Sequence, residues 1–293
     1  MSKRIISLII FLVIFGLLGG TIIYHQKKAR WLAHKQAIEN QKAEEITIRI
    51  IEGWTNKAIG EYLESKHLTS SANFLTTLSH YWPQEINQLL PPEAKGNLQG
   101  FLFPDTYRLF KSLTDRIITS ETETSQIVIK KLLTQFFSQL PDQAEHLAKQ
   151  QGLSLYEAIT LASIVENETG RNVLGAESKR LLDQERKIVA GIFYNRLRAN
   201  IPLQSDATIN YITGKKDPGA SLVDLEINSP YNTYKHRGLP PTPISNPSLS
   251  SILAVLNPTT TDYFYFLHKQ PSGEPIYSKT FEEHIKNKFK YLK

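Results

Sequence analysis

The sequence predicts a mixed α+β protein: an N-terminal transmembrane helix, then a small α+β module and a larger mixed α+β domain with a core helix. Three stretches carry this prediction. Residues 5–24 are uncharged and mostly apolar, and about twenty such residues cross the hydrocarbon core of a bilayer. Residues 46–51 alternate β-branched side chains as a strand does. Residues 154–170 form a helical pattern that is apolar nearly all round, which places that helix inside a domain.

The apolar run at residues 5–24 is followed by His25 and other polar residues, without the small residues of a signal-peptide cleavage site. A cleaved signal peptide is the alternative, but the run is long for one. We therefore expect a cytoplasmic tip and retained single-pass anchor over residues 1–24, and a helical stalk over residues 25–45. The flanking positive charges are nearly balanced, so charge alone does not set the orientation.

Composition disfavours several classes of function. The 293 residues include no cysteine, which removes disulfides, thiolate nucleophiles and cysteine-type zinc sites. The eight histidines are scattered without an HExxH motif, so we expect no metal site and no cofactor. The net charge of +6 is spread without a dense basic patch, which disfavours nucleic-acid binding. Motifs of serine hydrolases and nucleotide-binding loops are also absent.

A small module is predicted after the stalk. The strand at residues 46–51 leads into a helix capped by Thr55 and a second helix capped by Ser70 or its neighbour. This unit resembles a LysM-like module, a fold found in proteins that contact cell-wall glycans; a packing or positioning role is the alternative. Residues 98–107 are rich in aromatic side chains, and we expect them to form a buried docking hairpin. Module and docking segment together are predicted over residues 46–112.

The larger domain is predicted over residues 113–293. Its elements are assigned from the period of the apolar side chains, and its proline-rich loops are of the kind that carries binding residues. The expected order is an amphipathic helix at 113–140, a short helix from Pro141, the core helix at 154–170, a polar segment at 172–187, a second apolar helix at 188–197, a polar turn at 201–209, loops at 214–224, 228–234 and 238–247, a helix at 249–256, a strand at 263–267 paired across Gly273 with residues 276–277, and a closing helix at 281–291.

The core helix carries the candidate acid. Ser154 and Glu157 form a capping box that fixes its start. Glu166 and Glu168 fall in its last turn, where the free carbonyls of the helix end disfavour a carboxylate. Burial and a like-charged neighbour also favour the neutral form, which a general acid needs. We therefore predict Glu166 as the general acid; a structural pairing of this glutamate with an arginine such as Arg196 is the alternative.

Amide, hydroxyl, carboxyl and aromatic side chains cluster after this helix, and such groups suit a sugar-binding cleft. Sugars present hydroxyl groups at their edges and C–H groups on their faces, so amides and aromatic rings complement them. The candidate substrate-binding residues are Glu168, Asn195, Gln204, Ser205, Asp206, Asn232 and Tyr234.

Ordered motifs give the chain a specific resemblance. It resembles the YceG-like family of endolytic murein transglycosylases, over about residues 46–293. One departure is Asn167, where the family pattern leads us to expect lysine. The motifs are Leu161–Thr169, Phe193–Leu197, Leu203–Thr208, Tyr231–Tyr234, Gly238–Pro241, Ile244–Pro247, the strand at 263–266 and the Gly100–Tyr107 block.

The resemblance implies cleavage of peptidoglycan strands between N-acetylmuramic acid (MurNAc) and N-acetylglucosamine (GlcNAc), inside the glycan chain. It implies Glu166 as the catalytic acid, with Asp105 and Glu168 in support, and a product with a 1,6-anhydroMurNAc end. It also implies a catalytic domain on the extracytoplasmic side of the cytoplasmic membrane, with peptidoglycan synthases as possible partners on nascent strands.

Two other functions remain open at this point. A non-catalytic peptidoglycan-binding or scaffold protein would bind strands without making new chain ends. A hydrolytic muramidase would use a second carboxylate to activate water. Asp206 is the candidate for that second carboxylate.

Overall fold

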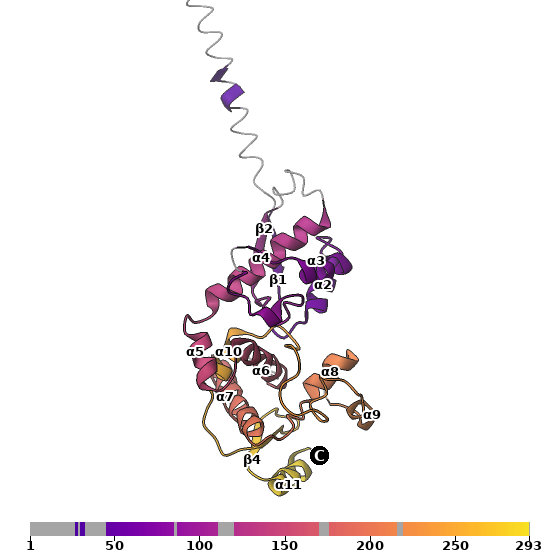
Figure 1. Cartoon of the computed structure of the whole chain (residues 1–293), viewed down its shortest axis with the longest axis vertical. Helices are drawn as coiled ribbons and strands as arrows, with labels where there is room; N and C mark the ends of the chain where they lie inside the picture. The colour runs from indigo at the N-terminus through magenta and orange to yellow at the C-terminus, as the bar shows by residue number, and fades with distance from the viewer. Residues whose placement is uncertain are drawn as a thin grey trace, which may run out of the picture. The chain divides into compact units, whose positions relative to one another are not determined.

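The computed structural model describes residues 27–28, 30–32, 45–84, 87–110, 120–169, 176–215 and 219–292 (Figure 1). The predicted anchor at residues 5–24 lies outside this set, as does most of the predicted stalk. Within the described ranges, no helix is both long and apolar enough to cross a membrane. The chain divides into two compact units, residues 1–47 with 108–118 and residues 48–107 with 119–293.

The elements agree with the predicted α+β class, in which helices dominate and the sheets are small. In chain order they are β1 (Glu45–Arg49), α2 (Asn56–Ser65), α3 (Ser71–His80), a 3₁₀ turn (Pro92–Ala94), β2 (Thr106–Phe110), α4 (Glu121–Gln139), α5 (Ala144–Gln150), α6 (Leu155–Glu168), α7 (Ala176–Arg198), α8 (Asp206–Thr213), α9 (Leu222–Leu225), α10 (Leu249–Leu256), β3 (Tyr265–His268), β4 (Pro275–Ser278) and α11 (Phe281–Tyr291).

β1 and β2 form a two-stranded sheet. The sequence predicts a hairpin within residues 98–107, and this prediction is wrong. The end of that segment instead enters β2, and its backbone groups are satisfied by β1, a strand far earlier in the chain. The hydrogen bond from Ile50 N to Asp105 O, at 2.9 Å, continues the same contact.

α2 and α3 pack against each other, and α4 packs against α3. Both predicted caps are confirmed, because the side chains of Thr55 and Ser70 accept hydrogen bonds from backbone N–H groups in the first turns of α2 and α3. At Gly60, an added β-carbon would lie 2.8 Å from Ser71 Oγ and 3.3 Å from Phe74 Cδ1, so the two helices approach closely here and a larger residue would displace the serine hydroxyl. The start predicted for α4, near residue 113, lies outside the described residues.

α6 is the centre of the larger unit, and Figure 1 shows it beside α7 and α10. Its capping box of Ser154 and Glu157 is present as predicted. Nearly every side chain from Tyr156 to Glu166 is buried, so this helix has no solvent face in that span. A β-carbon at Gly191 of α7 would clash with the carbonyl of Thr259, so α7 also packs closely against the chain that follows α10.

Three segments predicted as a polar stretch, a turn and a loop contain helices. α7 begins at Ala176, so the polar segment predicted at 172–187 is largely its solvent-exposed first half. α8 occupies part of the turn predicted at 201–209, and α9 lies in the loop predicted at 214–224. α9 is fixed by a capping box between Ser221 and Asp224. These helices are short or polar, so the apolar period does not identify them.

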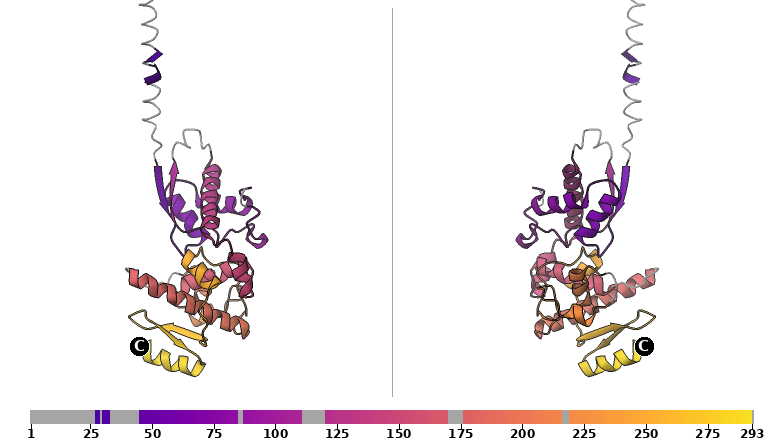
Figure 2. Two further views of the ribbon diagram at one scale, coloured as in Figure 1. Left: turned by 90° about the vertical axis from the view of Figure 1, so that its left-hand side faces the viewer. Right: turned by 90° about the vertical axis from the view of Figure 1, so that its right-hand side faces the viewer.

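The C-terminal hairpin and closing helix are confirmed. β3 and β4 pair antiparallel, with Tyr265 opposite Ser278 and His268 opposite Pro275. α11 packs against both strands, as both views of Figure 2 show. This C-terminal layer provides one wall of the site described next.

Candidate active site

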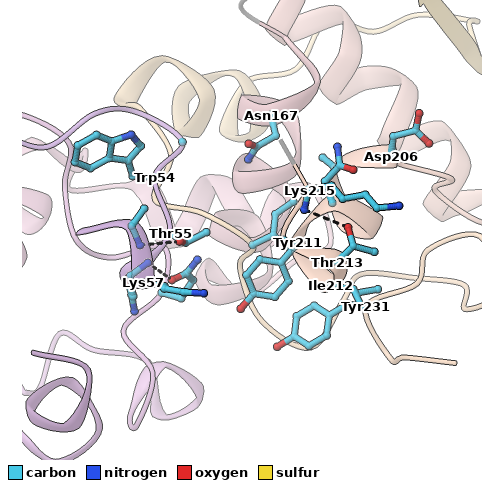
Figure 3. Close-up of a pocket in the computed structure, with 18 of the residues that line it drawn as sticks. Trp54, Thr55, Lys57, Asn167, Asp206, Tyr211, Ile212, Thr213, Lys215 and Tyr231 are labelled. Atoms are coloured by element: carbon cyan, nitrogen blue, oxygen red, sulfur yellow. Dashed lines mark hydrogen bonds between the residues drawn. The ribbon is translucent and has the colours of Figure 1, made fainter. Parts of the chain in front are cut away.

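A first cleft of about 1250 Å³ lies between the start of α2 and the segment around α8. Figure 3 shows Trp54 and Thr55 on one side of it and Tyr211 and Tyr231 on the other. The rings of Tyr211 and Tyr231 lie 5.0 Å apart. Aromatic faces and hydroxyl groups are suitable walls for a sugar polymer.

A second cleft of about 530 Å³ is lined by β3, α11 and the chain before α8. Glu168 and Asp206 line both clefts. Two carboxyl groups therefore lie where the clefts meet. A linear polymer that reaches into both would pass these groups with chain on either side.

Glu168 is held at the end of α6 by the chain that enters α8. Its Oε1 accepts hydrogen bonds from Ser205 Oγ at 2.5 Å and from Ala207 N at 3.4 Å. Gln204 adopts a left-handed conformation, with φ of 50°, and its N–H donates to Thr233 O. Left-handed backbone costs energy for a non-glycine residue and often marks a functional site. The turn at Gln204 thus orients the donors of Glu168.

Asp206 accepts a hydrogen bond from the hydroxyl of Tyr234 at 2.5 Å. Burial, and next this bond to Asp206, raise the pKa of Tyr234 above its ordinary value. Tyr234 therefore stays a phenol at neutral pH and donates to the carboxylate. Asp206 is the first residue of α8, where a negative charge is favoured by the helix dipole.

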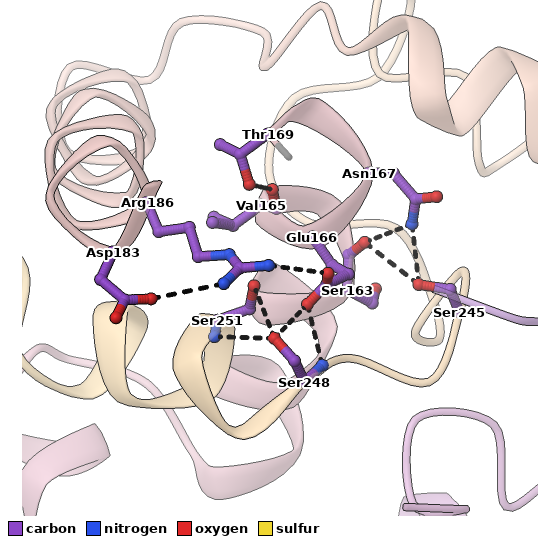
Figure 4. Close-up of polar contacts among 10 residues, drawn as sticks. All are labelled: Ser163, Val165, Glu166, Asn167, Thr169, Asp183, Arg186, Ser245, Ser248 and Ser251. Carbon is purple, nitrogen blue, oxygen red and sulfur yellow. Dashed lines mark hydrogen bonds and ion pairs between the residues drawn. The ribbon is translucent and has the colours of Figure 1, made fainter. Parts of the chain in front are cut away.

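Glu166 is in a different environment (Figure 4). It is 9 % exposed and lines neither cleft. Its Oε1 accepts from Arg186 Nη2 at 3.0 Å, and its Oε2 accepts from Ser248 N at 2.8 Å and Ser248 Oγ at 2.5 Å. Both oxygens of Glu166 are therefore occupied by donors from α7 and from the start of α10. The sequence suggests Arg196 as an example of a structural partner for Glu166. The partner is instead Arg186, which lies nearer the start of α7.

Two of the predicted binding residues serve the backbone. Asn195 Nδ2 donates to Thr261 O and Tyr263 O, at 2.7 and 2.9 Å. Asn232 is fully buried and its Nδ2 donates to the carbonyls of Leu225 and Ile227. Neither asparagine lines a cleft, so their contact with substrate stays a prediction without geometric support.

The remaining predicted residues divide in the same way. Gln204, Ser205 and Tyr234 line the second cleft together with Glu168 and Asp206. Asp105 instead accepts a hydrogen bond from Gln135 Nε2 at 2.8 Å and lines neither cleft. Among the residues that the structure describes, no group of three or more acidic or histidine side chains could hold a metal ion.

Sequence reasoning misses Asn246, a fully buried residue that joins the chain before α2 to residues 100–102. Its Oδ1 accepts from Gly100 N and Leu102 N, and its Nδ2 donates to Trp54 O. Asn246 lies within the Ile244–Pro247 motif, but an asparagine in a proline-rich loop gives no sign of which distant backbone groups it binds. Ser248 was detectable, because a serine directly before an apolar helix is a typical N-cap, and it caps α10 here.

The α+β fold thus presents two open clefts that share Glu168 and Asp206 in their lining, an arrangement that suits an extended polymer as ligand. Residues 24–290 match the model of the YceG-like family, so the chain belongs to this family.

Characterised relatives and a solved structure are similar to this chain. It is 36% identical over 221 residues to an endolytic murein transglycosylase of Bacillus subtilis, covering 75% of this chain and 55% of the relative. An endolytic murein transglycosylase of Streptococcus pneumoniae is 36% identical over 199 residues, covering 66% of this chain and 32% of that relative. The match thus spans about half the length of the Bacillus subtilis relative and about a third of the Streptococcus pneumoniae relative. The crystal structure of a putative YceG-like protein from Listeria monocytogenes matches with a TM-score of 0.65 and 31% identity, covering 82% of this chain and 75% of that one.

Proposed function

We propose that this chain is an endolytic lytic transglycosylase that cleaves the MurNAc–GlcNAc bond within peptidoglycan strands. The observation that carries the proposal is the position of Glu168 at the junction of two open clefts. An enzyme that cuts inside a polymer needs room for chain on both sides of its acid. The activity named for the relatives from Bacillus subtilis and Streptococcus pneumoniae supports the same assignment.

The proposed acid is Glu168, although the sequence favours Glu166. Both carboxylate oxygens of Glu166 accept hydrogen bonds, from Arg186 and from Ser248, and Glu166 lines neither cleft. Glu168 lines both clefts, and Ser205 and the start of α8 fix its carboxyl group. A general acid must lie within hydrogen-bond reach of the proton it transfers, so geometry comes first.

The chemistry needs only one carboxyl group. Glu168 donates its proton to the glycosidic oxygen, and the bond from that oxygen to C1 of MurNAc breaks. The C6 hydroxyl of the same sugar then bonds to C1, and its proton returns to Glu168. The products are a GlcNAc hydroxyl and a 1,6-anhydroMurNAc end, and no water is consumed.

A hydrolytic muramidase is the second candidate, because Asp206 lies beside Glu168 at the same junction. Glycosidases that use water pair an acid with a second carboxylate. In this chain Asp206 already accepts a hydrogen bond from Tyr234, which occupies one of its oxygens. This bond favours a positioning role for Asp206, but product analysis is the test.

The test is digestion of purified glycan strands by the full-length chain. A lyase generates 1,6-anhydro ends and no new reducing ends, whereas a hydrolase generates reducing ends. A non-catalytic scaffold, the third possibility, binds strands and generates neither. Internal cutting shortens the whole length distribution early in the reaction, while cutting from an end releases small fragments first. New reducing ends in place of anhydro ends would contradict the proposal.

We further propose that residues 5–24 anchor the chain in the cytoplasmic membrane, with the catalytic part on the extracytoplasmic side and peptidoglycan synthases as partners. The apolar run and the chemistry of the substrate support this. Fractionation of cells, with protease added from outside, tests it. A chain that is soluble or protected from protease would contradict it.

A further inference from the structure

The second cleft contains a buried cation that makes no ion pair with the residues that the structure describes. Arg196 is 7 % exposed and lines this cleft. Its Nε donates to Phe264 O at 2.6 Å, and its Nη1 donates to Leu203 O at 2.8 Å. No carboxylate of the described residues lies within ion-pair distance of it. Burial lowers the pKa of Arg196, as it does for a cation whose charge its surroundings do not fully compensate.

The cations of the first cleft differ, since each has a carboxylate beside it. Lys215 Nζ lies 2.6 Å from Asp224 Oδ2, and Lys57 Nζ lies 3.9 Å from Glu61 Oε1. The two clefts therefore present different electrostatics to a ligand. In the first cleft each lysine has a carboxylate within 4 Å. In the second, which Glu168 and Asp206 also line, no carboxylate of the described residues lies within ion-pair distance of Arg196 or Lys288.

α11 adds to the charge of the second cleft. Lys288 lines it, and no carboxylate within the described ranges pairs with this lysine. His284 also lines the cleft. Its ring stacks on the ring of Tyr265, with the two centroids 5.3 Å apart, and Arg196 Cζ lies 4.9 Å from the centroid of the same Tyr265 ring. His284 Nδ1 is buried without a hydrogen-bond partner in the described part of the chain. Burial, Lys288 and Arg196 lower the pKa of His284, so the positive charge comes from the lysine and the arginine.

We propose that the second cleft binds the carboxylate-bearing peptide of the glycan strand, with Arg196 and Lys288 attracting its carboxylate. The sugars of such a strand are neutral, and its carboxylates belong to the attached peptides, so an unpaired cation beside Glu168 matches the peptide rather than the sugar. Aromatic walls such as Tyr265 and Phe281 suit the apolar parts of a peptide. The inference rests on the proposed function for the identity of the strand.

The test measures binding by the full-length Glu168→Gln protein, which leaves the ligand intact. The probes are a soluble peptide-bearing disaccharide from peptidoglycan and the same molecule with its carboxylates converted to amides. We expect amidation to weaken binding about tenfold, because charge-assisted hydrogen bonds are lost. Equal affinity for both probes would overturn the inference.

Substitutions on α11 locate the effect. Lys288→Gln should weaken binding of the acidic probe about threefold, as for a partly exposed charge pair. Lys286→Gln, on the same helix but outside the cleft, is the matched control and should change nothing. Arg196 is left intact because its hydrogen bonds hold the fold. An equal effect of the two lysine substitutions would also overturn the inference.

The outcome is separable from the proposed function. If the wild-type chain cuts no strand but binds the acidic probe through Lys288, the lytic activity is wrong and the peptide site stands. If the chain cuts strands to anhydro ends and amidation leaves affinity unchanged, the activity stands and the peptide site is wrong.

Discussion

Glu166 and Glu168 are two residues apart on one helix, yet their surroundings are opposite. Glu166 faces Arg186 of α7 and Ser248, the N-cap residue of α10, and is buried. Glu168 faces Ser205 and lies at the junction of two clefts. At about 100° per residue, a two-residue step turns a side chain roughly 200° around the helix. Glu166, the buried glutamate, therefore fixes α6 against α7 and the start of α10, and Glu168, which lines the clefts, is the one placed to act on a substrate.

The largest effect is expected for Glu168→Gln. The amide cannot donate a proton to the glycosidic oxygen, so the rate of formation of anhydro ends should fall about a thousandfold. Because the side chain lies at a cleft, the free energy of unfolding should change by less than about 1 kcal/mol. Rates from chromatography of strand digests measure this. Activity within tenfold of the wild type would remove Glu168 from the mechanism.

Glu166→Gln should act on stability instead. It leaves Arg186 buried without its main partner, and breaking a buried ion pair on one side costs about 3 kcal/mol. Urea denaturation measures this loss. Glu145→Gln, which breaks an exposed pair with Lys149 on α5, is the control and should have no measurable effect. A Glu166→Gln protein of wild-type stability would contradict the structural role.

Ser205→Ala tests how Glu168 is positioned. The substitution removes the hydroxyl that donates to Glu168 Oε1, so the carboxyl group loses its fixed orientation. We expect kcat to fall about tenfold with little change in KM, because binding walls are unaffected. Ser138→Ala on the exposed side of α4 serves as the control. A change confined to KM would point to substrate contact rather than positioning.

Ser248→Ala tests the other glutamate. Ser248 caps α10 and donates to Glu166, so its loss should cost about 1 kcal/mol of unfolding free energy. In a double-mutant cycle, Ser248→Ala and Glu166→Gln should be clearly non-additive, because they share one hydrogen bond. Strict additivity would show that the two residues are not coupled.

Asp224 provides a reference carboxylate with a defined pH response. The hydrogen bonds from Lys215, and next from Ser221, lower the pKa of Asp224 from 3.8 to about 2. A carboxylate with a lowered folded-state pKa contributes stability above its unfolded pKa and loses it as pH falls through the folded value. The contribution should therefore disappear between about pH 4 and pH 2. Between about pH 4 and pH 2 the melting temperature should fall more steeply with decreasing pH for the wild type than for Asp224→Asn. Equal pH dependence of the two melting temperatures would contradict the assignment.

Much of the fold follows from local sequence signals. Thr55, Ser70 and the Ser154–Glu157 box set helix starts through contacts within one turn, and the apolar period identifies α6 and α10. The partner of β2 depends on a segment far away in the chain, and so the sequence predicts a local hairpin that does not form. α8 is short and bordered by polar groups, so its pattern resembles a turn.

The site shows a similar limit. The sequence places two glutamates at the end of α6, but a helix apolar nearly all round has no polar stripe to show which glutamate faces the cleft. The partner of Glu166 is equally hidden, because both Arg186 and Arg196 lie on α7 and only packing selects between them. Gln204 and Ser205 in the turn before α8, and Asp206 at the start of α8, are predictable as site residues because polar groups cluster there in the sequence.

The most direct measurement is a side-by-side comparison of Glu166→Gln and Glu168→Gln, at a temperature where both are folded. Urea denaturation and yield of 1,6-anhydro ends are measured on the same preparations. We predict that Glu168→Gln keeps wild-type stability and loses the anhydro product, while Glu166→Gln loses about 3 kcal/mol of stability and, when folded, still forms that product. Abolished product in folded Glu166→Gln, together with an active Glu168→Gln, would contradict the account.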